Sequence, residues 1–204
     1  MFLTASCFRV DKKTFVSQPC LAHVGPYARI WGLRHRNGSR IVLLPDTMVR
    51  LEITTVIAAP IQRCFDLSRS IDLQVDSAHG TGERAVAGVT GGLIGMGQEV
   101  TWKARQFGFD VRHTSRITAF DSPFYFQDLM QRGVFKSYCH DHHFEVWKSG
   151  TTMLDVVEFE APLGLLGRLA EKFVIKRRMQ KLLERRNAFI KQTAEAAQWR
   201  KYLG

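Results

Sequence analysis

The alternation of apolar and polar residues begins only after the first 47 positions. Residues 1–47 keep no helical or alternating period over ten positions, whereas residues 51–57 place Leu51, Ile53 and Ile57 on one face, as in a half-buried strand. We therefore expect residues 48–204 to form the domain. Residues 1–47 are predicted to be an irregular N-terminal extension, disordered or not native to the protein, with a functional extension as the alternative.

Two short helices and a glycine-rich segment are predicted after this strand. Pro60 suits the first turn of a helix, and a second short helix is expected over residues 70–75. Seven glycines between positions 80 and 97 then indicate a short strand over 84–89 and a flexible hairpin or lid around 93–96. The run GGLIGMG lacks the Gly-Lys-Ser/Thr signature of a phosphate loop, so phosphate binding is not favoured.

The rest of the chain predicts a series of hairpins followed by one long helix. Alternating runs are found at 98–107, 109–120, 124–132, 135–147 and 151–160. From Leu165 to about Ala197 the apolar residues fall on one broad face at helical spacing. This order predicts an α+β domain in which one antiparallel sheet packs against a long C-terminal helix.

Composition and charge narrow the classes of function. A chain of 204 residues that is 45% hydrophobic suits one core. Its net charge of +10 belongs to the N-terminal segment and the C-terminal helix, because residues 48–162 carry 11 basic and 14 acidic side chains, so we expect no nucleic-acid partner. The longest uncharged apolar run has 11 residues and no secretory signal precedes it, which predicts a cytoplasmic protein. The four scattered cysteines are interpreted as reduced thiols.

Several segments resemble one known superfamily. They are EVTWKA at 99–104, RITAFDSPF at 116–124, FQD at 126–128, HDHHF at 140–144 and TMLDVVEFEAPLG at 152–164. Together they resemble the SRPBCC (START/Bet v 1-like) superfamily, in its bacterial polyketide cyclase/dehydrase-like and lipid-transport-like group. The resemblance implies a helix-grip fold: a curved antiparallel sheet wrapped around a long C-terminal helix, with two short helices after the first strand. It does not choose between passive lipid binders and cyclases.

An internal cavity is expected on physical grounds as well. A curved sheet closed by one helix leaves a gap that side chains do not always fill, and such gaps are mainly apolar with a few polar groups. The residues predicted to line it and bind a ligand are Phe65, Leu73, Leu93, Ile94, Met96, Trp102, Phe126, Tyr138, His140, Met153, Leu169 and Phe173. The alternative for each of them is simple core packing.

The densest titratable cluster lies on the predicted strand 135–147. His140 and His142 share one strand face, and Asp128 or Asp155 could supply a further ligand to a zinc ion. Hydrogen bonding between strands is the favoured interpretation, so we expect no metal and no other cofactor. No Gly-x-Ser-x-Gly motif occurs, and Cys139 lies on the opposite face from His140, so covalent catalysis is not expected. The candidates for proton transfer are His113, Asp128, His140, His142 and Asp155.

Three functions follow, in order of preference. The first is binding, or transport, of a hydrophobic small molecule or lipid in the internal cavity. The second is a cyclase/dehydratase-type enzyme that uses interior His and Asp residues. The third is a lipid carrier that makes transient contact with an anionic membrane surface through basic residues of the last helix. Those basic residues are Lys172, Lys176, Arg177, Arg178, Lys181, Arg185 and Arg186.

Overall fold

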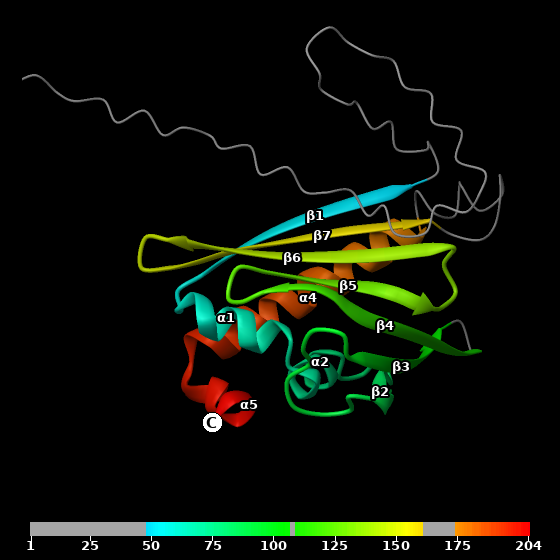
Figure 1. Ribbon diagram of the computed structural model, residues 1–204, viewed down its shortest axis with the longest axis horizontal. Coiled ribbons are helices and arrows are strands. Elements are labelled where there is room, and N and C mark those ends of the chain that lie inside the picture. The colour runs from blue at the N-terminus through cyan, green and yellow to red at the C-terminus, as the bar shows by residue number, and fades with distance from the viewer. Residues whose placement is uncertain (1–47, 107–108, 161–173) are drawn as a thin grey trace, which may run out of the picture. The chain divides into compact units, whose positions relative to one another are not determined.

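A computed structural model describes residues 48–106, 109–160 and 174–204. The predicted extension 1–47 and the predicted ligand residues Leu169 and Phe173 lie outside the described residues. Seven strands form one antiparallel sheet in the order β1-β7-β6-β5-β4-β3-β2 (Figure 1). The strands are β1 (Val49–Ile57), β2 (Arg84–Gly88), β3 (Glu99–Gln106), β4 (Phe109–Asp121), β5 (Tyr125–Arg132), β6 (Ser137–Trp147) and β7 (Gly150–Glu160). The predicted hairpin series is confirmed, with boundaries that differ by one or two residues.

The two faces of the sheet differ as the alternation predicts. On β1, Leu51 and Ile57 are buried while Arg50 and Glu52 are exposed. The strand pairing continues these faces across the sheet, because Ile57 lies opposite Thr151 and Leu51 lies opposite Val157 on β7. The concave face therefore carries most of the core.

The helices α1 (Ile61–Ser68) and α2 (Ile71–Ser77) follow β1. Pro60 is the N-cap of α1, one position earlier than expected, and the hydroxyl of Ser70 caps α2 by accepting a hydrogen bond from the Leu73 amide. Helix α1 contributes the fully buried side chains of Phe65 and Leu67 to the core, against β6 and β7. These contacts close one end of the concave face.

The long helix α4 (Lys176–Glu195) covers the concave face and contacts β1, α1 and α2 (Figure 1). Its buried residues include Leu183, Asn187 and Ile190, which are three or four positions apart. The predicted start at Leu165 lies outside the described residues. Within the described ranges, no helix combines the length and apolarity needed to cross a bilayer.

A short C-terminal element was not predicted. A 3₁₀ turn (Ala197–Trp199) leads into α5 (Arg200–Leu203), and Trp199 and Tyr202 pack against the core. The hydroxyl of Tyr202 donates a hydrogen bond to Asp76 at the end of α2. Four residues are too few to show a helical period, so only tertiary contacts reveal this element.

The glycine-rich segment is tied to the helices. The Gly92 amide donates to Asp72 Oδ2, the Ile71 amide donates to the Gly92 carbonyl, and the Ile94 amide donates to the Arg69 carbonyl. These bonds turn Ile94 inward, where it is 4% exposed, while Met96 is 61% exposed. Residues 91–97 therefore form a strap that is hydrogen-bonded over the α1–α2 junction, and the predicted hairpin is not formed.

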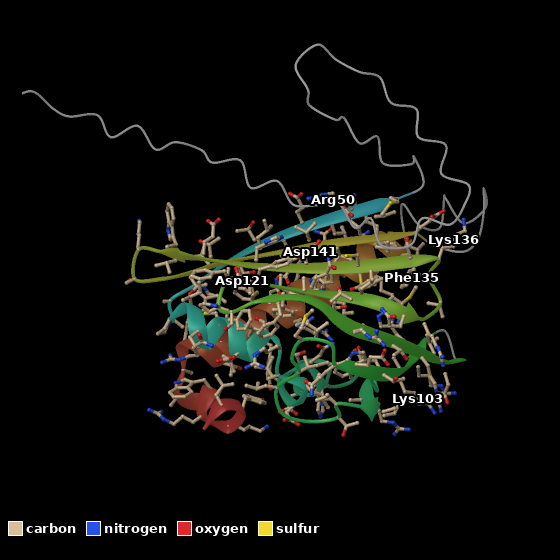
Figure 2. All side chains as sticks on the ribbon, in the orientation of Figure 1. Arg50, Lys103, Asp121, Phe135, Lys136 and Asp141 are labelled. Carbon is tan, nitrogen blue, oxygen red and sulfur yellow. The ribbon has the colours of Figure 1, made fainter. Side chains whose placement is uncertain are left out.

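The convex face of the sheet holds its own polar contacts. Arg50 pairs with Glu158, and Asp141 accepts hydrogen bonds from Tyr125 and Gln127 on β5 (Figure 2). Asp141 thus lies on the face opposite His140 and His142, as the alternation predicts. Its hydrogen bonds to Tyr125 and Gln127 stabilise the sheet, so a candidate functional site is expected on the concave face.

Candidate functional site

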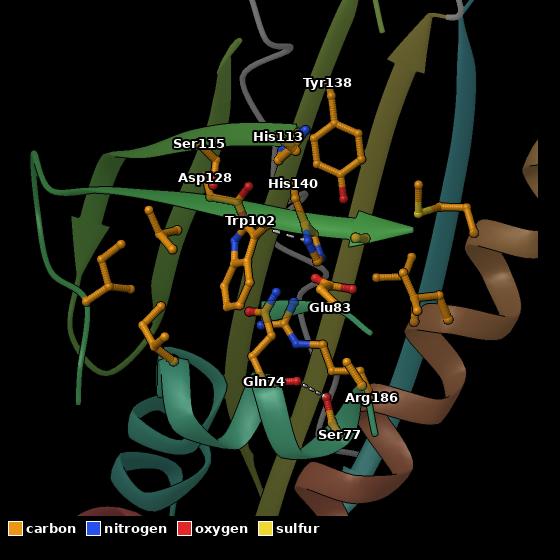
Figure 3. Close-up of a pocket in the computed structure, with 18 of the residues that line it drawn as sticks. Gln74, Ser77, Glu83, Trp102, His113, Ser115, Asp128, Tyr138, His140 and Arg186 are labelled. Carbon is orange, nitrogen blue, oxygen red and sulfur yellow. Dashed lines mark hydrogen bonds and ion pairs between the residues drawn. The ribbon is translucent and has the colours of Figure 1, made fainter. Parts of the chain in front are cut away.

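A cavity of about 160 Å³, partly open to solvent, lies between the sheet, α2 and α4 (Figure 3). Its apolar wall comes mainly from β3 and β4, with Val100, Trp102, Val111 and Ile117, and from Ile94 of the strap. An engineered protein cavity of about this size holds a single six-carbon ring. Because the cavity also opens to solvent, it suits a compact ligand of one or two rings.

Polar side chains of the sheet line one side of the cavity. They are His113 on β4, Asp128 on β5, and Tyr138 and His140 on β6 (Figure 3). His113 and Tyr138 meet edge to face, with ring centroids 5.2 Å apart. Burial lowers the pKa of His113, so this imidazole is neutral near pH 7.

A second polar group faces the sheet from the helical side. Arg186 of α4 extends into the cavity beside Glu83 and Gln74 (Figure 3). Its Nη2 donates to the Ser68 carbonyl at 2.8 Å, while its buried Nε finds no hydrogen-bond partner among the described residues. Burial raises the pKa of Glu83, although Arg186 and Gln74 oppose the shift.

Behind this wall, the strand register builds a cluster of two imidazoles and two carboxylates. Asp128 lies directly opposite His140, and Asp155 lies directly opposite His142. Because the two histidines are two positions apart on β6, each carboxylate is also the diagonal neighbour of the other histidine. The imidazoles consequently lie between the two carboxylates, with ring centroids 3.8 Å apart.

The two carboxylates contact the imidazoles differently. Oδ1 of Asp155 lies 3.0 Å from His140 Nε2 and 2.7 Å from His142 Nδ1. Oδ2 of Asp128 is farther away, 3.7 Å from His140 Nδ1 and 3.5 Å from His142 Nε2. Asn187 of α4 donates to the other oxygen of Asp155 at 2.7 Å. Asp155 is thus fixed by direct contacts, whereas a gap separates Asp128 from both rings.

Charge in the cluster follows from these distances. Burial alone would raise the pKa of Asp155, yet the hydrogen bonds from His140 and His142 hold it well below its usual range. Burial alone would lower the pKa of His142, but the carboxylates of Asp128 and Asp155 raise it. Burial and the neighbouring charge of His142 lower the pKa of His140. The two carboxylates therefore favour the charged form of His142, whereas burial and that neighbouring charge favour the neutral form of His140.

The structure brings together only part of the predicted ligand set. Ile94, Trp102, Phe126, Tyr138 and His140 line the cavity. Among the catalytic candidates, His113 and Asp128 also line it, while His142 and Asp155 lie immediately behind. Contact with a ligand stays a prediction for each of them.

Five other predicted residues lie elsewhere. Phe65, Leu73 and Met153 are at most 1% exposed and pack in the core, because α1 and α2 press them onto the sheet beyond the cavity. Met96 points to solvent, since the strap turns Ile94 inward instead. Leu93 pairs with Ser70 through an isolated bridge and is not among the residues that line the cavity.

Arg186 and Glu83 were not predicted as site residues. Arg186 was grouped with the exposed basic residues of the last helix, but it lies three positions after the buried Leu183 and seven after Met179, which also lines the cavity. Helical spacing therefore placed it on the inner face and could have identified it. Glu83 follows a glycine-rich turn and carries no periodic signal.

The comparisons with known proteins support the fold. No protein-family model and no curated protein matches the sequence. Solved structures do match: TTHA0849 from Thermus thermophilus aligns at a TM-score of 0.56 and 18% identity, over 70% of this chain and 97% of that one. The ginseng major latex-like protein 151 from Panax ginseng aligns at 0.54 and 14%, over 74% and 99%.

A third match comes from a protein of two domains. The di-domain ARO/CYC StfQ from the steffimycin biosynthetic pathway aligns at a TM-score of 0.61 and 12% identity, over 74% of this chain and 51% of that one. This chain shares the helix-grip fold of these solved structures. The resemblance seen in the sequence is thereby confirmed for the fold. A fold does not identify a function, so the function of this helix-grip domain has to be inferred from its cavity.

Proposed function

We propose that this helix-grip domain binds a compact apolar molecule of one or two rings that carries an acceptor oxygen. The observation that carries the proposal is the cavity itself, with an apolar wall on β3 and β4 and polar groups on two sides. Such a division of the lining is typical of small-molecule sites, in which the apolar wall binds the body and a few polar groups fix its orientation. The structural neighbours, a latex-like protein and ARO/CYC domains, are consistent with this class of function.

Arg186 supports the acceptor oxygen on the ligand. Its buried Nε has no hydrogen-bond partner among the residues described, and a buried donor without a partner costs roughly 1 to 3 kcal/mol. A carbonyl or carboxylate oxygen of the ligand would satisfy this donor. Trp102, which is 6% exposed and lines the cavity, offers an indole face to the ring of the same ligand.

Native mass spectrometry tests the proposal. The purified full chain should carry an extractable small molecule, or should take up compounds such as naphthol and naphthoic acid from a panel of ring compounds at 1:1 stoichiometry. The Ser115→Leu variant fills the cavity from β4 and is expected to lower uptake at least tenfold. The Ser137→Leu variant makes the same change at an exposed position of β6 and should bind normally. Equal uptake by both variants, or no uptake by the wild type, contradicts the proposal.

A second candidate function is proton transfer next to a carbonyl group, as in a cyclase or dehydratase. The observation in its favour is the pairing of His140 with Asp155: Nε2 donates to the buried carboxylate, so Nδ1 is the basic nitrogen of a ring that lines the cavity. A carboxylate that orients an imidazole in this way is a common device for acid–base catalysis. In such a step, Nδ1 would accept a proton from a carbon next to the carbonyl and return it to the product.

Turnover distinguishes the second candidate from simple binding. The bound compound and its precursors are offered to the wild type, to His140→Ala and to Asp155→Asn. Conversion that disappears in both variants while binding persists would favour the enzyme. Binding without any conversion by the wild type would leave the carrier function.

The third predicted function, docking on an anionic membrane, is supported by some of the basic residues on which it was based. Arg177, Lys181 and Arg185 are exposed on α4, but Arg186 points into the cavity and Lys172 lies outside the described residues. Sedimentation with anionic vesicles would test it. A cytoplasmic location likewise stays a prediction.

A further inference from the structure

We propose that His140, His142 and Asp128 form a binding site for one divalent transition-metal ion, zinc or iron(II), in the wall of the cavity. Two imidazoles and one carboxylate are a common protein donor set for both ions. The site does not depend on the organic ligand proposed above, so either proposal can fail without the other.

The positions of the donor atoms support the proposal. Oδ2 of Asp128 lies 3.7 Å from His140 Nδ1 and 3.5 Å from His142 Nε2. All three donor atoms lie within 4.8 Å of one another. Bonds of about 2.0 to 2.1 Å in tetrahedral geometry require donors to lie about 3.3 Å apart. Both distances from Asp128 Oδ2 exceed this value by less than about 0.5 Å, so small shifts of the three side chains would bring the donors to bonding positions.

The second carboxylate has the contacts expected of a group that orients metal ligands. Oδ1 of Asp155 lies 3.0 Å from His140 Nε2 and 2.7 Å from His142 Nδ1, which are the nitrogens that face away from Asp128. With protons on these nitrogens, the lone pairs of the other two point toward Asp128. Metal-bound histidines usually pair their second nitrogen with such a carboxylate, and Asn187 holds Asp155 in place through its other oxygen.

His142 provides an independent sign that a partner is missing. The residue is 1% exposed, and while its Nδ1 lies 2.7 Å from Asp155 Oδ1, its Nε2 has no aligned hydrogen-bond partner among the described residues. Its Nε2 lies 3.5 Å from Asp128, which exceeds the usual length of a hydrogen bond. A buried imidazole is costly without a partner. A cation between His142 and Asp128 would supply one and would offset the charge of the two carboxylates.

The location gives the ion access to the cavity. His140 and Asp128 line the cavity, while His142 lies behind them, so the remaining coordination positions of the ion would face the ligand space. Binding sites with three protein ligands and an open position are typical of catalytic zinc. An ion on Nδ1 of His140 would also occupy the nitrogen that the acid–base candidate uses, so the metal site and a free His140 base exclude each other.

The sequence alone favoured no metal, because no cysteine and no second histidine motif completes a site beside His140 and His142. The register changes that assessment, since it places Asp128 opposite His140 and Asp155 opposite His142. A metal site is therefore proposed in place of the expected absence of a metal, and titration with metal ions decides between the two.

The test is a titration of the chelator-treated full chain with Co²⁺ and with Zn²⁺. We expect one equivalent to bind, visible band absorption from Co²⁺ of low coordination number, and competition between the two ions. The near-isosteric Asp128→Asn and His142→Gln variants should bind at least a hundredfold more weakly. Asp155→Asn should weaken binding by roughly 10- to 100-fold, the effect usual for an outer partner.

His143→Gln is the matched control, because His143 neighbours His142 on β6 but stacks on Tyr125 at the opposite face of the sheet. It should bind the ion as the wild type does. Circular dichroism confirms that each variant is folded, and Asp128→Asn serves if His142→Gln fails to fold, since Asp128 lies at the partly open wall. Absence of stoichiometric binding to the wild type overturns the proposal. So does binding that Asp128→Asn leaves unchanged, or that His143→Gln lowers as much.

Discussion

The two ends of the concave face differ although the same strands build both. At one end Phe65 of α1 meets Phe120, Phe126 and Phe144 edge to face, with centroids 5.3 to 5.5 Å apart, and is itself fully buried. At the other end the sheet presents polar side chains of β4, β5 and β6 beside the apolar wall of the cavity. The packed end stabilises the domain, and the cavity end presents polar side chains to a ligand.

Strand β6 passes from one end to the other within seven residues. Its inward side chains are Tyr138, His140, His142 and Phe144, spaced about 6.6 Å apart along the strand. His142 is the boundary, because it stacks on Phe126 at 4.1 Å and touches His140 on its other side. The packed aromatic end thus supports the cluster of His140, His142 and the two carboxylates beside the cavity. Packing of this kind holds buried polar groups in fixed positions.

The largest effect is expected from Phe65→Ala at the packed end. The change leaves a void among three rings and should lower the free energy of unfolding by about 3 to 5 kcal/mol. Urea denaturation measures the loss. Phe124→Ala, at a position that is 50% exposed, is the control and should stay within about 0.5 kcal/mol of the wild type. A loss below about 1 kcal/mol for Phe65→Ala would show that this end is loosely packed.

The next effect concerns Asn187, which joins the helix to the cluster. Asn187→Leu removes the donor to Asp155 and leaves a buried carboxylate oxygen without that hydrogen bond, so a loss of about 1 to 3 kcal/mol is expected. Gln180→Leu, at an exposed position of the same helix, should have little effect. Equal stability of the two variants in urea would mean that Asp155 needs no support from α4.

Much of this comparison could be predicted from the sequence, and the reasons are local. Alternation assigned Leu51 and Ile57 to one face of β1, and it separated Asp141 from His140 on β6. Helical spacing predicted the inner face of α4 at Leu183 and Ile190. Each of these assignments depends only on the period of a strand or a helix.

The boundary between cavity and core could not be predicted in this way. Phe65, Leu73 and Met153 have the same apolar character as Ile94 and Trp102, and only the packing of α1 and α2 decides which of them fill the core. The histidine cluster depends on register, a long-range property that a single strand does not carry. Glu83 lines the cavity because it directly follows the turn at Gly80 and Gly82, and the conformation of that turn has no periodic signal in the sequence.

A binding effect, rather than a stability effect, is expected from Arg186→Met at the cavity end. Loss of the guanidinium removes the donor to the acceptor oxygen and should weaken ligand binding about tenfold, equivalent to roughly 1.4 kcal/mol. Isothermal titration with the strongest compound of the panel measures it. Arg185→Met, the exposed neighbour on α4, should bind normally. Tighter binding to Arg186→Met would show that the ligand is apolar throughout.

The smallest effect is a change in pH dependence caused by Glu83. Because burial raises its pKa, against Arg186 and Gln74, the folded protein holds this proton more tightly than the unfolded chain does. Stability should therefore fall as the pH rises from the ordinary pKa of glutamate through the raised one. Glu83→Gln should equal the wild type below this window and exceed it above, by less than about 1 kcal/mol. Thermal unfolding across the pH range measures the difference, with Glu145→Gln, at an exposed position, as the unaffected control. If Glu83→Gln were less stable than the wild type at neutral pH, the predicted direction of the pH effect would be wrong.

The most direct measurement of the central claim is an NMR titration of the full chain with the ring compound that binds best. If the cavity end is the ligand site, the indole NH of Trp102, the ring of His140 and the side chain of Arg186 should shift together and saturate at one equivalent. The rings of Phe65 and Phe144 at the packed end should change little. Shifts confined to the packed end or to exposed residues, or no saturable shift for any compound in the panel, would contradict the account.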